Sequence, residues 1–212
     1  MSPYLLGVYE SELHPIWEAL CLGAYRQVID VGAKFGYCAA GLLMRLPNVP
    51  VVAFDTDPWA REAIGEIRLI NGFQDSINIQ GFCDVNWLRH HLLPDALVVS
   101  DCEGYEGALL DPVQVPELIF ASIVVELHEH ESPGIADLLR NRFCQSHQII
   151  EVMSDEMHRL APVDLSFLSP QQAATAMSHL RPKQSWLVMI PRSSKELNVR
   201  ASLAKATHAV DV

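Results

Sequence analysis

The feature that most constrains the fold is a pair of short apolar runs, each of which ends in an aspartate. The first run, Val28-Ile-Asp30, leads into Val31-Gly-Ala-Lys-Phe-Gly36, where two glycines stand four residues apart. The second run, Val51-Val-Ala-Phe54, ends in Asp55, which lies 19 residues after Gly36. This order predicts a strand, a tight turn, a helix and a second strand with an acidic end, the arrangement by which α/β sheets hold ligands that contain adenosine.

The two glycines narrow the class of ligand. Because glycine lacks a Cβ, Gly32 and Gly36 allow the backbone to bend sharply and to approach a ligand closely. Their spacing differs from the G-x-G-x-x-G pattern of dinucleotide-binding sheets, so the ligand need not be NAD. Asp55 stands where a ribose-binding carboxylate is expected. A strand–helix turn without a ligand is the alternative, and the acidic end of the second run speaks against it.

The composition sets the class of protein. The chain has 212 residues, half of them hydrophobic, which suits one domain with a sizeable core. No apolar run approaches the roughly 20 residues of a membrane span, and the N-terminus lacks the basic flank and cleavage site of a secretory signal. The five cysteines form no C-x-x-C pair, which is typical of reduced thiols. We therefore expect a cytoplasmic protein that makes no membrane contact.

The charge of the chain bears on its partners. The formal net charge is −11 at pH 7. A nucleic-acid backbone would be repelled by such a chain. We therefore expect a small-molecule substrate and no nucleic-acid partner. The sequence leaves open whether the chain forms a homodimer.

Strand and helix patterns alternate along the chain, which predicts a mostly parallel sheet covered on both faces. Strands are expected at 26–31, 51–55, 76–82, 96–100, 122–127, 148–153 and 186–190. Helices are expected at 13–23, 37–46, 59–69, 132–143 and 171–179. The long insertion between the last two strands predicts an antiparallel edge. The expected fold is a Rossmann-like α/β domain over residues 1–192 with a seven-stranded, doubly wound sheet, followed by a C-terminal tail over residues 193–212.

Acidic residues follow five consecutive strands of this expected sheet. Ligands of open α/β sheets bind beyond the carboxyl ends of the strands. A carboxylate at the rim of the core is costly unless it is paired, so a ligand, a metal or a hydrogen-bond donor is expected beside it. The acids nearest the five strand ends are Asp30, Asp55, Asp84, Asp101 and Glu126.

Four stretches resemble the successive motifs of FkbM-type methyltransferases, which are class I enzymes that use S-adenosylmethionine. The resemblance covers residues 26–145, and the Asp-x-Glu-Gly-x-Glu pattern after the fourth strand is its most specific part. The family usually has glutamate in place of Asp55 and a hydrophobic residue in place of Cys102. The four stretches are Asp30-Val-Gly-Ala-Lys-Phe-Gly-Tyr37, Ala53-Phe-Asp-Thr-Asp-Pro58, Ser100-Asp-Cys-Glu-Gly-Tyr-Glu106 and Val124-Val-Glu-Leu-His-Glu129.

The resemblance implies that the cofactor S-adenosylmethionine lies along the first three strand ends. The backbone from Gly32 to Gly36 would cradle its methionine portion, and Asp30 would anchor the turn or reach the amino group through water. Asp55 would accept charge-assisted hydrogen bonds from both ribose hydroxyls. For Asp84, capping of the next helix is as well supported as contact with the ligand. Three residues would border the adenine: Thr56, Cys83 and Asp84.

Four residues are the candidates for the chemistry itself, Asp101, Glu103, Glu126 and His128. Three of them, Asp101, Glu126 and His128, are the candidate metal ligands. The fourth and fifth strands are neighbours in this architecture, and Glu126 and His128 share a face if the strand stays extended. In one hypothesis the three side chains hold Mg²⁺ or Mn²⁺, which orients a substrate hydroxyl. In the other, no metal is used and Asp101 or His128 takes the proton as general base. A solvated cluster without a role in the reaction is the remaining alternative.

The expected activity is methyl transfer from S-adenosylmethionine to the oxygen of a small molecule, such as a natural product or a sugar hydroxyl. A nucleotide-binding dehydrogenase or epimerase is disfavoured because both G-x-G-x-x-G and a Tyr-x-x-x-Lys pair are absent from the sequence. A catalytically silent methyltransferase-like binding domain stays open. The presence of Gly32, Gly36, Asp55 and Asp101 argues against it.

Overall fold

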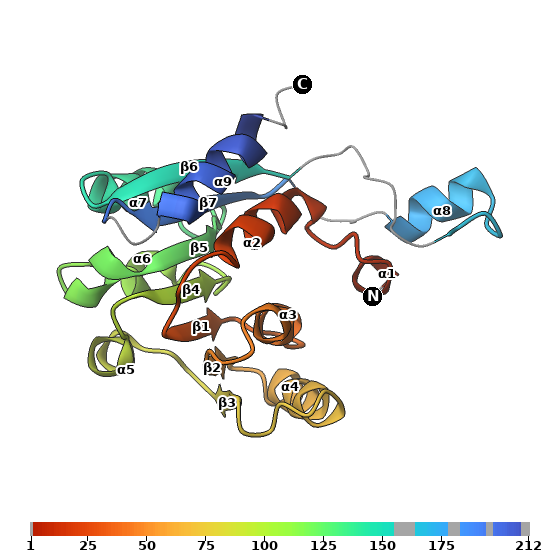
Figure 1. The fold of residues 1–212 in the computed structure, drawn as a ribbon, viewed down its shortest axis with the longest axis horizontal. Coiled ribbons are helices and arrows are strands. Elements are labelled where there is room, and N and C mark those ends of the chain that lie inside the picture. Colours follow the sequence, from red (N-terminus) through yellow and green to blue (C-terminus); the bar gives the residue numbers. More distant parts are fainter. Residues whose placement is uncertain (1, 155–163, 178–182, 194–196, 209–212) are drawn as a thin grey trace.

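A single seven-stranded sheet forms the centre of the molecule (Figure 1). The computed structural model describes residues 2–154, 164–177, 183–193 and 197–208, and the structural statements below concern these ranges. The strand order is β3-β2-β1-β4-β5-β7-β6. The strands are β1 (Gln27–Val31), β2 (Val51–Phe54), β3 (Ile77–Gln80), β4 (Ala96–Ser100), β5 (Ser122–Glu126), β6 (His147–Met153) and β7 (Ser185–Pro191).

The directions of the strands confirm the predicted fold class. Strands β1 to β5 pair in parallel. Strand β7 pairs antiparallel with β5 on one side and with β6 on the other, so it enters the sheet between them. The chain moves outward from β1 to β3 and then returns to place β4 on the other side of β1. The order of the strands therefore reverses between β1 and β4, which is where sheets of this kind bind ligands.

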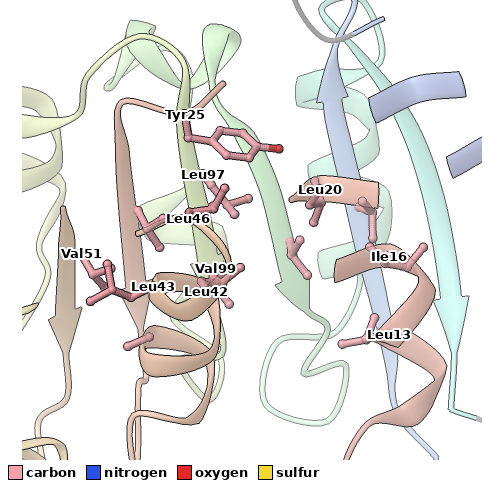
Figure 2. Packing of buried hydrophobic residues seen from close by; sticks show 14 of the residues in the cluster. Leu13, Ile16, Leu20, Tyr25, Leu42, Leu43, Leu46, Val51, Leu97 and Val99 are labelled. Carbon is pink, nitrogen blue, oxygen red and sulfur yellow. The ribbon is translucent and has the colours of Figure 1, made fainter. Parts of the chain in front are cut away.

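Helices cover both faces of the sheet because consecutive residues of a buried strand point to opposite sides. In β1, Val28 belongs to one hydrophobic cluster and Ile29 to the other. The first cluster lies against α2 (His14–Leu20), α3 (Tyr37–Arg45), α4 (Pro58–Ile70) and α9 (Leu197–His208). The second lies against α5 (Val85–His91), α6 (Glu106–Leu109), η2 (Pro116–Phe120) and α7 (Ile135–Phe143). Figure 2 shows residues of the first cluster, which include Ile16 and Leu20 from α2, Leu42 and Leu43 from α3, and Leu97 and Val99 from β4.

Local chemistry explains where the helices differ from the sequence prediction. The expected helix 13–23 is shorter, because a 3₁₀ turn η1 (Ser11–Leu13) precedes α2 and Pro15 lies in the first turn of α2. The expected helix 132–143 begins only at Ile135, after Gly134 with its left-handed φ of 83°. Helix α8 (Pro170–Met177) matches the start of the expected helix 171–179, whose last two residues lie outside the described ranges.

The C-terminal segment contributes to the core. Helix α9 packs against α2, with Val199 and Leu203 buried in the first cluster. Residues 197–208 fall in the expected C-terminal tail and form this helix, while 194–196 and 209–212 lie outside the described ranges. Near the other terminus, α1 (Ser2–Leu5) contacts α8, away from the sheet (Figure 1). In the part of the chain that the structure describes, no helix is both long and apolar enough to cross a bilayer.

Candidate active site

The loop after β1 brings the first strand end against the end of β4. The amide of Asp101 donates a hydrogen bond to the carbonyl of Val31 at 2.8 Å. Gly32 has φ +82°, and a Cβ on it would lie 1.7 Å from the backbone oxygen of Asp101. Gly36 also has a positive φ, +73°, and precedes α3. The requirement for glycine at position 32 therefore comes from a neighbouring strand end, a cause that the sequence analysis did not foresee.

Backbone amides fix the carboxylate of Asp55. Oδ2 accepts a hydrogen bond from the amide of Lys34 at 2.8 Å, and Oδ1 accepts one from the amide of Asp57 at 2.8 Å. Each carboxylate oxygen can accept a further hydrogen bond. Lys34 takes a left-handed φ of 50°, which turns its amide towards the end of β2. Asp55 is therefore an oriented acceptor with capacity left for a ligand.

A cavity of about 270 Å³ lies beyond the ends of β2 and β3, and we name it the outer cavity. It is lined by Asp55, Thr56 and Cys83, whose role at the cofactor stays a prediction, together with two aromatic rings. These rings belong to Phe82 and Tyr105, and their centroids are 5.2 Å apart. Asp84 does not line this cavity. Its carboxylate accepts a hydrogen bond from the amide of Trp87 at 2.6 Å, which is the capping role at the start of α5.

A second, smaller cavity of about 50 Å³ lies beyond the ends of β1, β4 and β5, and we name it the inner cavity. It is lined by Asp30, Asp101 and Glu126, and by Glu10 from the N-terminal segment. Gly32, Lys34 and Asp101 line both cavities. The two cavities therefore meet at the point where the strand order reverses.

Three of the four residues predicted for the chemistry, Asp101, Glu126 and His128, lie together. One ligand atom from each of Asp101, Glu126 and His128 falls within 4.8 Å of the others. His128 Nε2 is 3.4 Å from Asp101 Oδ1 and 3.3 Å from a carboxylate oxygen of Glu103. On the other side of the ring, His128 Nδ1 donates to Glu106 Oε1 at 2.6 Å. The predicted proximity is confirmed, while the roles of the three residues stay predictions.

Glu106 is the member of this network that the sequence analysis missed. Its side chain is fully buried, and Oε1 also accepts hydrogen bonds from the amides of Cys102 at 3.3 Å and Gly104 at 3.2 Å. Burial raises its pKa, but the hydrogen bonds from His128 and from the backbone outweigh burial and lower it. The signal in the sequence was the glycine of Asp101-Cys-Glu-Gly-Tyr-Glu106. Gly104 has φ +102°, and this bend returns the chain so that Glu106 lies beneath the strand end.

Burial and neighbouring charges shift the titration of this network. Burial raises the pKa of Asp101 to about 6, although the charge of His128 opposes the shift. For His128, burial favours the neutral ring, but the hydrogen bond and charge of Glu106, with Asp101 and Glu126, raise its pKa to about 9. At neutral pH an imidazolium therefore lies among ionised carboxylates.

Asp30 is a buried acid with one open carboxylate oxygen. It is 2% exposed, and its Oδ2 accepts no hydrogen bond from the described residues. Burial, helped by the charge of Asp101, raises its pKa to about 7. An uncompensated carboxylate oxygen in a cavity wall indicates that a donor from outside the chain completes the site.

Comparison with known proteins shows the fold. No protein-family profile and no curated protein matches the chain. The B. subtilis M1A22 tRNA methyltransferase TrmK superposes with a TM-score of 0.54 at 11% identity, covering 84% of this chain and 64% of TrmK, so this chain spans less than two thirds of that protein. A precorrin-6y C5,15-methyltransferase from Geobacter metallireducens superposes with a TM-score of 0.52 at 10% identity, covering 82% and 84%. A candidate rRNA methylase from Clostridium thermocellum gives a TM-score of 0.57 at 12% identity, covering 84% and 96%. The chain therefore has the Rossmann-like fold of class I methyltransferases.

Proposed function

We propose that this chain is an S-adenosylmethionine-dependent methyltransferase of the FkbM type that methylates an oxygen atom of a small molecule. One observation carries the proposal: two cavities meet at Gly32 and Asp101, and their linings differ in chemistry. The outer cavity has an oriented carboxylate and aromatic rings, as an adenosine requires. The inner cavity has an ionisable network, as proton removal from an acceptor requires.

The residues present fit S-adenosylmethionine. Asp55 has acceptor capacity for two ribose hydroxyls, and Phe82 and Tyr105 offer ring surface for the adenine. The open oxygen of Asp30 suits the ammonium group of the methionine portion. When bound, the cofactor supplies an electrophilic methyl group, whose transfer to oxygen forms a C–O bond, breaks an S–C bond and releases S-adenosylhomocysteine and a proton.

Asp101 is our candidate for the group that takes this proton. It lines both cavities, and its raised pKa of about 6 lies near the value that suits a general base at neutral pH. His128, held as an imidazolium by Glu106, orients Asp101 and stabilises negative charge beside it. Glu126 completes the acidic wall.

A metal-assisted form of the same reaction has one observation in its favour. The ligand atoms of Asp101, Glu126 and His128 are close enough to share one cation. Mg²⁺ or Mn²⁺ at this position would lower the pKa of an acceptor hydroxyl. We favour the metal-free form because the imidazolium already supplies a positive charge to these acids.

The net charge supports a small-molecule acceptor. A chain with a charge of −11 repels a phosphate backbone, so we propose that it does not act on RNA, unlike the tRNA methyltransferase TrmK.

Calorimetry tests the proposed function directly. S-adenosylmethionine, S-adenosylhomocysteine and NAD are titrated separately into the full chain. We expect both sulfur compounds to bind and NAD to give no signal. Binding of NAD without binding of S-adenosylhomocysteine would instead indicate the dehydrogenase or epimerase class. Binding of S-adenosylhomocysteine together with methyl transfer to an added alcohol would exclude a silent domain.

A further inference from the structure

A groove of about 210 Å³ lies between α2 and α3, and we name it the helix groove. Trp17 and Cys21 line it from α2 and the C-cap of that helix, and Tyr37, Gly41 and Arg45 line it from α3. The three residues of α3 stand four apart, so they share one face, which extends over about 12 Å of the helix. The groove therefore runs along α3 from Tyr37 at one end to Arg45 at the other.

The helix groove meets the inner cavity, because Trp17, Tyr37 and Cys38 line both. The inner cavity, at about 50 Å³, is small beside the roughly 300–1,000 Å³ of typical ligand pockets. It has room for the hydroxyl group of a methyl acceptor and the atoms next to it, but not for a whole acceptor molecule. The rest of the acceptor must therefore extend into a neighbouring space.

Two other sides of the inner cavity are already occupied. The proposed function assigns the adjoining outer cavity to the cofactor. On the side of the N-terminal segment, the inner cavity is lined by the rings of Tyr4 and Tyr9, which are stacked with centroids 3.8 Å apart. The helix groove is the neighbouring space that remains for the acceptor among those that the described residues line.

A glycine opens the middle of the helix groove. Gly41 stands at the centre of α3, although glycine is the poorest helix former after proline. In the described part of the chain, no atom lies within 4 Å of a Cβ added at Gly41, so no internal contact requires a glycine there. A large side chain at this position would fill the space between Tyr37 and Arg45.

The walls of the helix groove suit an uncharged ligand. Burial raises the pKa of Cys21 and of Cys38, so both thiols stay protonated at neutral pH and present apolar surface. At the far end, the guanidinium of Arg45 donates hydrogen bonds to both carboxylate oxygens of Glu18, which compensates its charge. A hydrocarbon placed between these walls is removed from water, which is favourable.

We propose that the helix groove binds an uncharged apolar tail of the methyl acceptor, whose hydroxyl group lies in the inner cavity beside Asp101. The substrate class is then an alcohol or phenol that carries a hydrocarbon chain or ring. This inference rests on the proposed function, because that function places the acceptor oxygen at Asp101.

The alcohols 1-hexanol and 1-octanol form a suitable pair of probes, since they differ only in the length of the tail. Each is titrated by calorimetry into the full chain saturated with S-adenosylhomocysteine. We expect 1-octanol to bind more tightly by about fourfold for each added methylene, or about 15-fold in all. Gly41→Leu should reduce this ratio to near unity and leave the affinity for S-adenosylhomocysteine unchanged. Gly65→Leu is the matched control, because it adds the same side chain to α4 outside the helix groove and both cavities, and it should keep the ratio.

The outcomes separate this inference from the proposed function. If S-adenosylhomocysteine does not bind, the proposed function fails and the inference fails with it. If it binds but the wild type binds both alcohols equally well, only the helix groove is refuted, and this comparison needs no variant to fold. A ratio that persists in Gly41→Leu would place the tail elsewhere and would also refute it. Thermal unfolding followed by circular dichroism checks the fold of Gly41→Leu. Cys21→Leu, which narrows the groove from the side of α2, is a second variant that should lower the ratio.

Discussion

The outer and inner cavities both contain acidic side chains, but these carboxylates lie in different surroundings. In the outer cavity, Asp55 is partly exposed and two backbone amides hold its carboxylate. In the lining of the inner cavity, Asp30 and Glu126 are buried, and the buried ring of His128 lies close to Asp101 and Glu126. A carboxylate fixed by the backbone is a rigid acceptor, which suits binding. Carboxylates that share a buried imidazolium have shifted proton affinities, which suits proton transfer.

The boundary between the cavities is where the addition of a single methyl group should lower the stability of the fold most. A Cβ at Gly32 would collide with the backbone of Asp101, so Gly32→Ala should lower the free energy of unfolding by about 3 kcal/mol or more. Gly41→Ala is the matched control, because nothing lies within 4 Å of its added Cβ and helix propensity predicts a gain of up to about 1 kcal/mol. Urea unfolding measures both. Equal stability of Gly32→Ala and wild type would show that the backbone of Asp101 can move to accommodate the added methyl group.

Removing the charge at Asp101 should separate chemistry from binding. Asp101→Asn keeps the shape of the side chain but loses the proton acceptor, so turnover should fall about 10²-fold or more. The dissociation constant of S-adenosylhomocysteine should stay close to the wild-type value, since the substitution keeps the shape of the side chain and leaves Asp55 with its two backbone hydrogen bonds. Steady-state kinetics and calorimetry measure the two quantities. An equal loss of turnover and of affinity for S-adenosylhomocysteine would mean that the two cavities do not have separate roles in chemistry and in cofactor binding.

The converse change is Asp55→Ala. It removes charge-assisted bonds to the ribose, and the affinity for S-adenosylhomocysteine should fall by about 1.5–3 kcal/mol, or roughly 10- to 150-fold. Turnover at saturating cofactor should be retained. Asp75→Ala removes the same charge from an exposed site outside both cavities and serves as the control. Unchanged affinity in Asp55→Ala would remove Asp55 from the cofactor site.

The outer cavity was more predictable from sequence than the inner one. Asp55 follows directly after the short apolar run of β2, so its place at the strand end was predictable from position, while Thr56 and Cys83 came from the family resemblance; all three line this cavity. The strand Ala96–Ser100 was predicted to the residue, because it is buried on both faces and reads as a continuous apolar run.

The inner cavity depends on contacts that are distant along the chain. Tyr4, Tyr9 and Glu10 come from a segment with no helical or strand periodicity, and they reach the site only through tertiary packing. Glu106 lies 22 residues from His128 and looks like a surface acid at the start of a short helix. Helix α9 has a weakly amphipathic sequence, so the burial of Val199 and Leu203 was not apparent either.

The pair of Glu106 and His128 should make stability depend on pH in a defined window. The pKa of His128 is raised to about 9 in the folded chain, against an unfolded value of about 6.5. Its contribution is therefore complete below pH 6.5 and is lost as the pH rises through 9. Asp30, with a folded pKa of about 7, also makes the free energy of unfolding fall as the pH rises. The pH profile of the wild type alone therefore does not isolate the contribution of Glu106 and His128. Glu106→Gln should lose on the order of 1–2 kcal/mol at neutral pH and flatten the alkaline side of the profile. Urea unfolding between pH 6 and 10, with a chelator present, measures this. An unchanged profile would contradict the assigned pair.

The smallest expected effect is that of removing metal ions. A divalent cation bound by His128 would need a neutral ring with a free lone pair on Nε2, whereas Glu106 and the neighbouring acids favour the imidazolium. The proton on His128 thus supplies the charge that a metal would otherwise bring. Turnover after treatment with EDTA should therefore change by less than about twofold, against the several kcal/mol of barrier lowering that a catalytic metal contributes. Calorimetry with Mn²⁺ compares the wild type with Glu106→Gln. Loss of Glu106 makes the imidazolium form of His128 less favourable, so the variant should bind Mn²⁺ more tightly. Activity that disappears with EDTA and returns with Mg²⁺ or Mn²⁺ would assign Asp101, Glu126 and His128 to a metal centre instead. The two cavities would then differ in that the outer one binds an organic ligand and the inner one a cation.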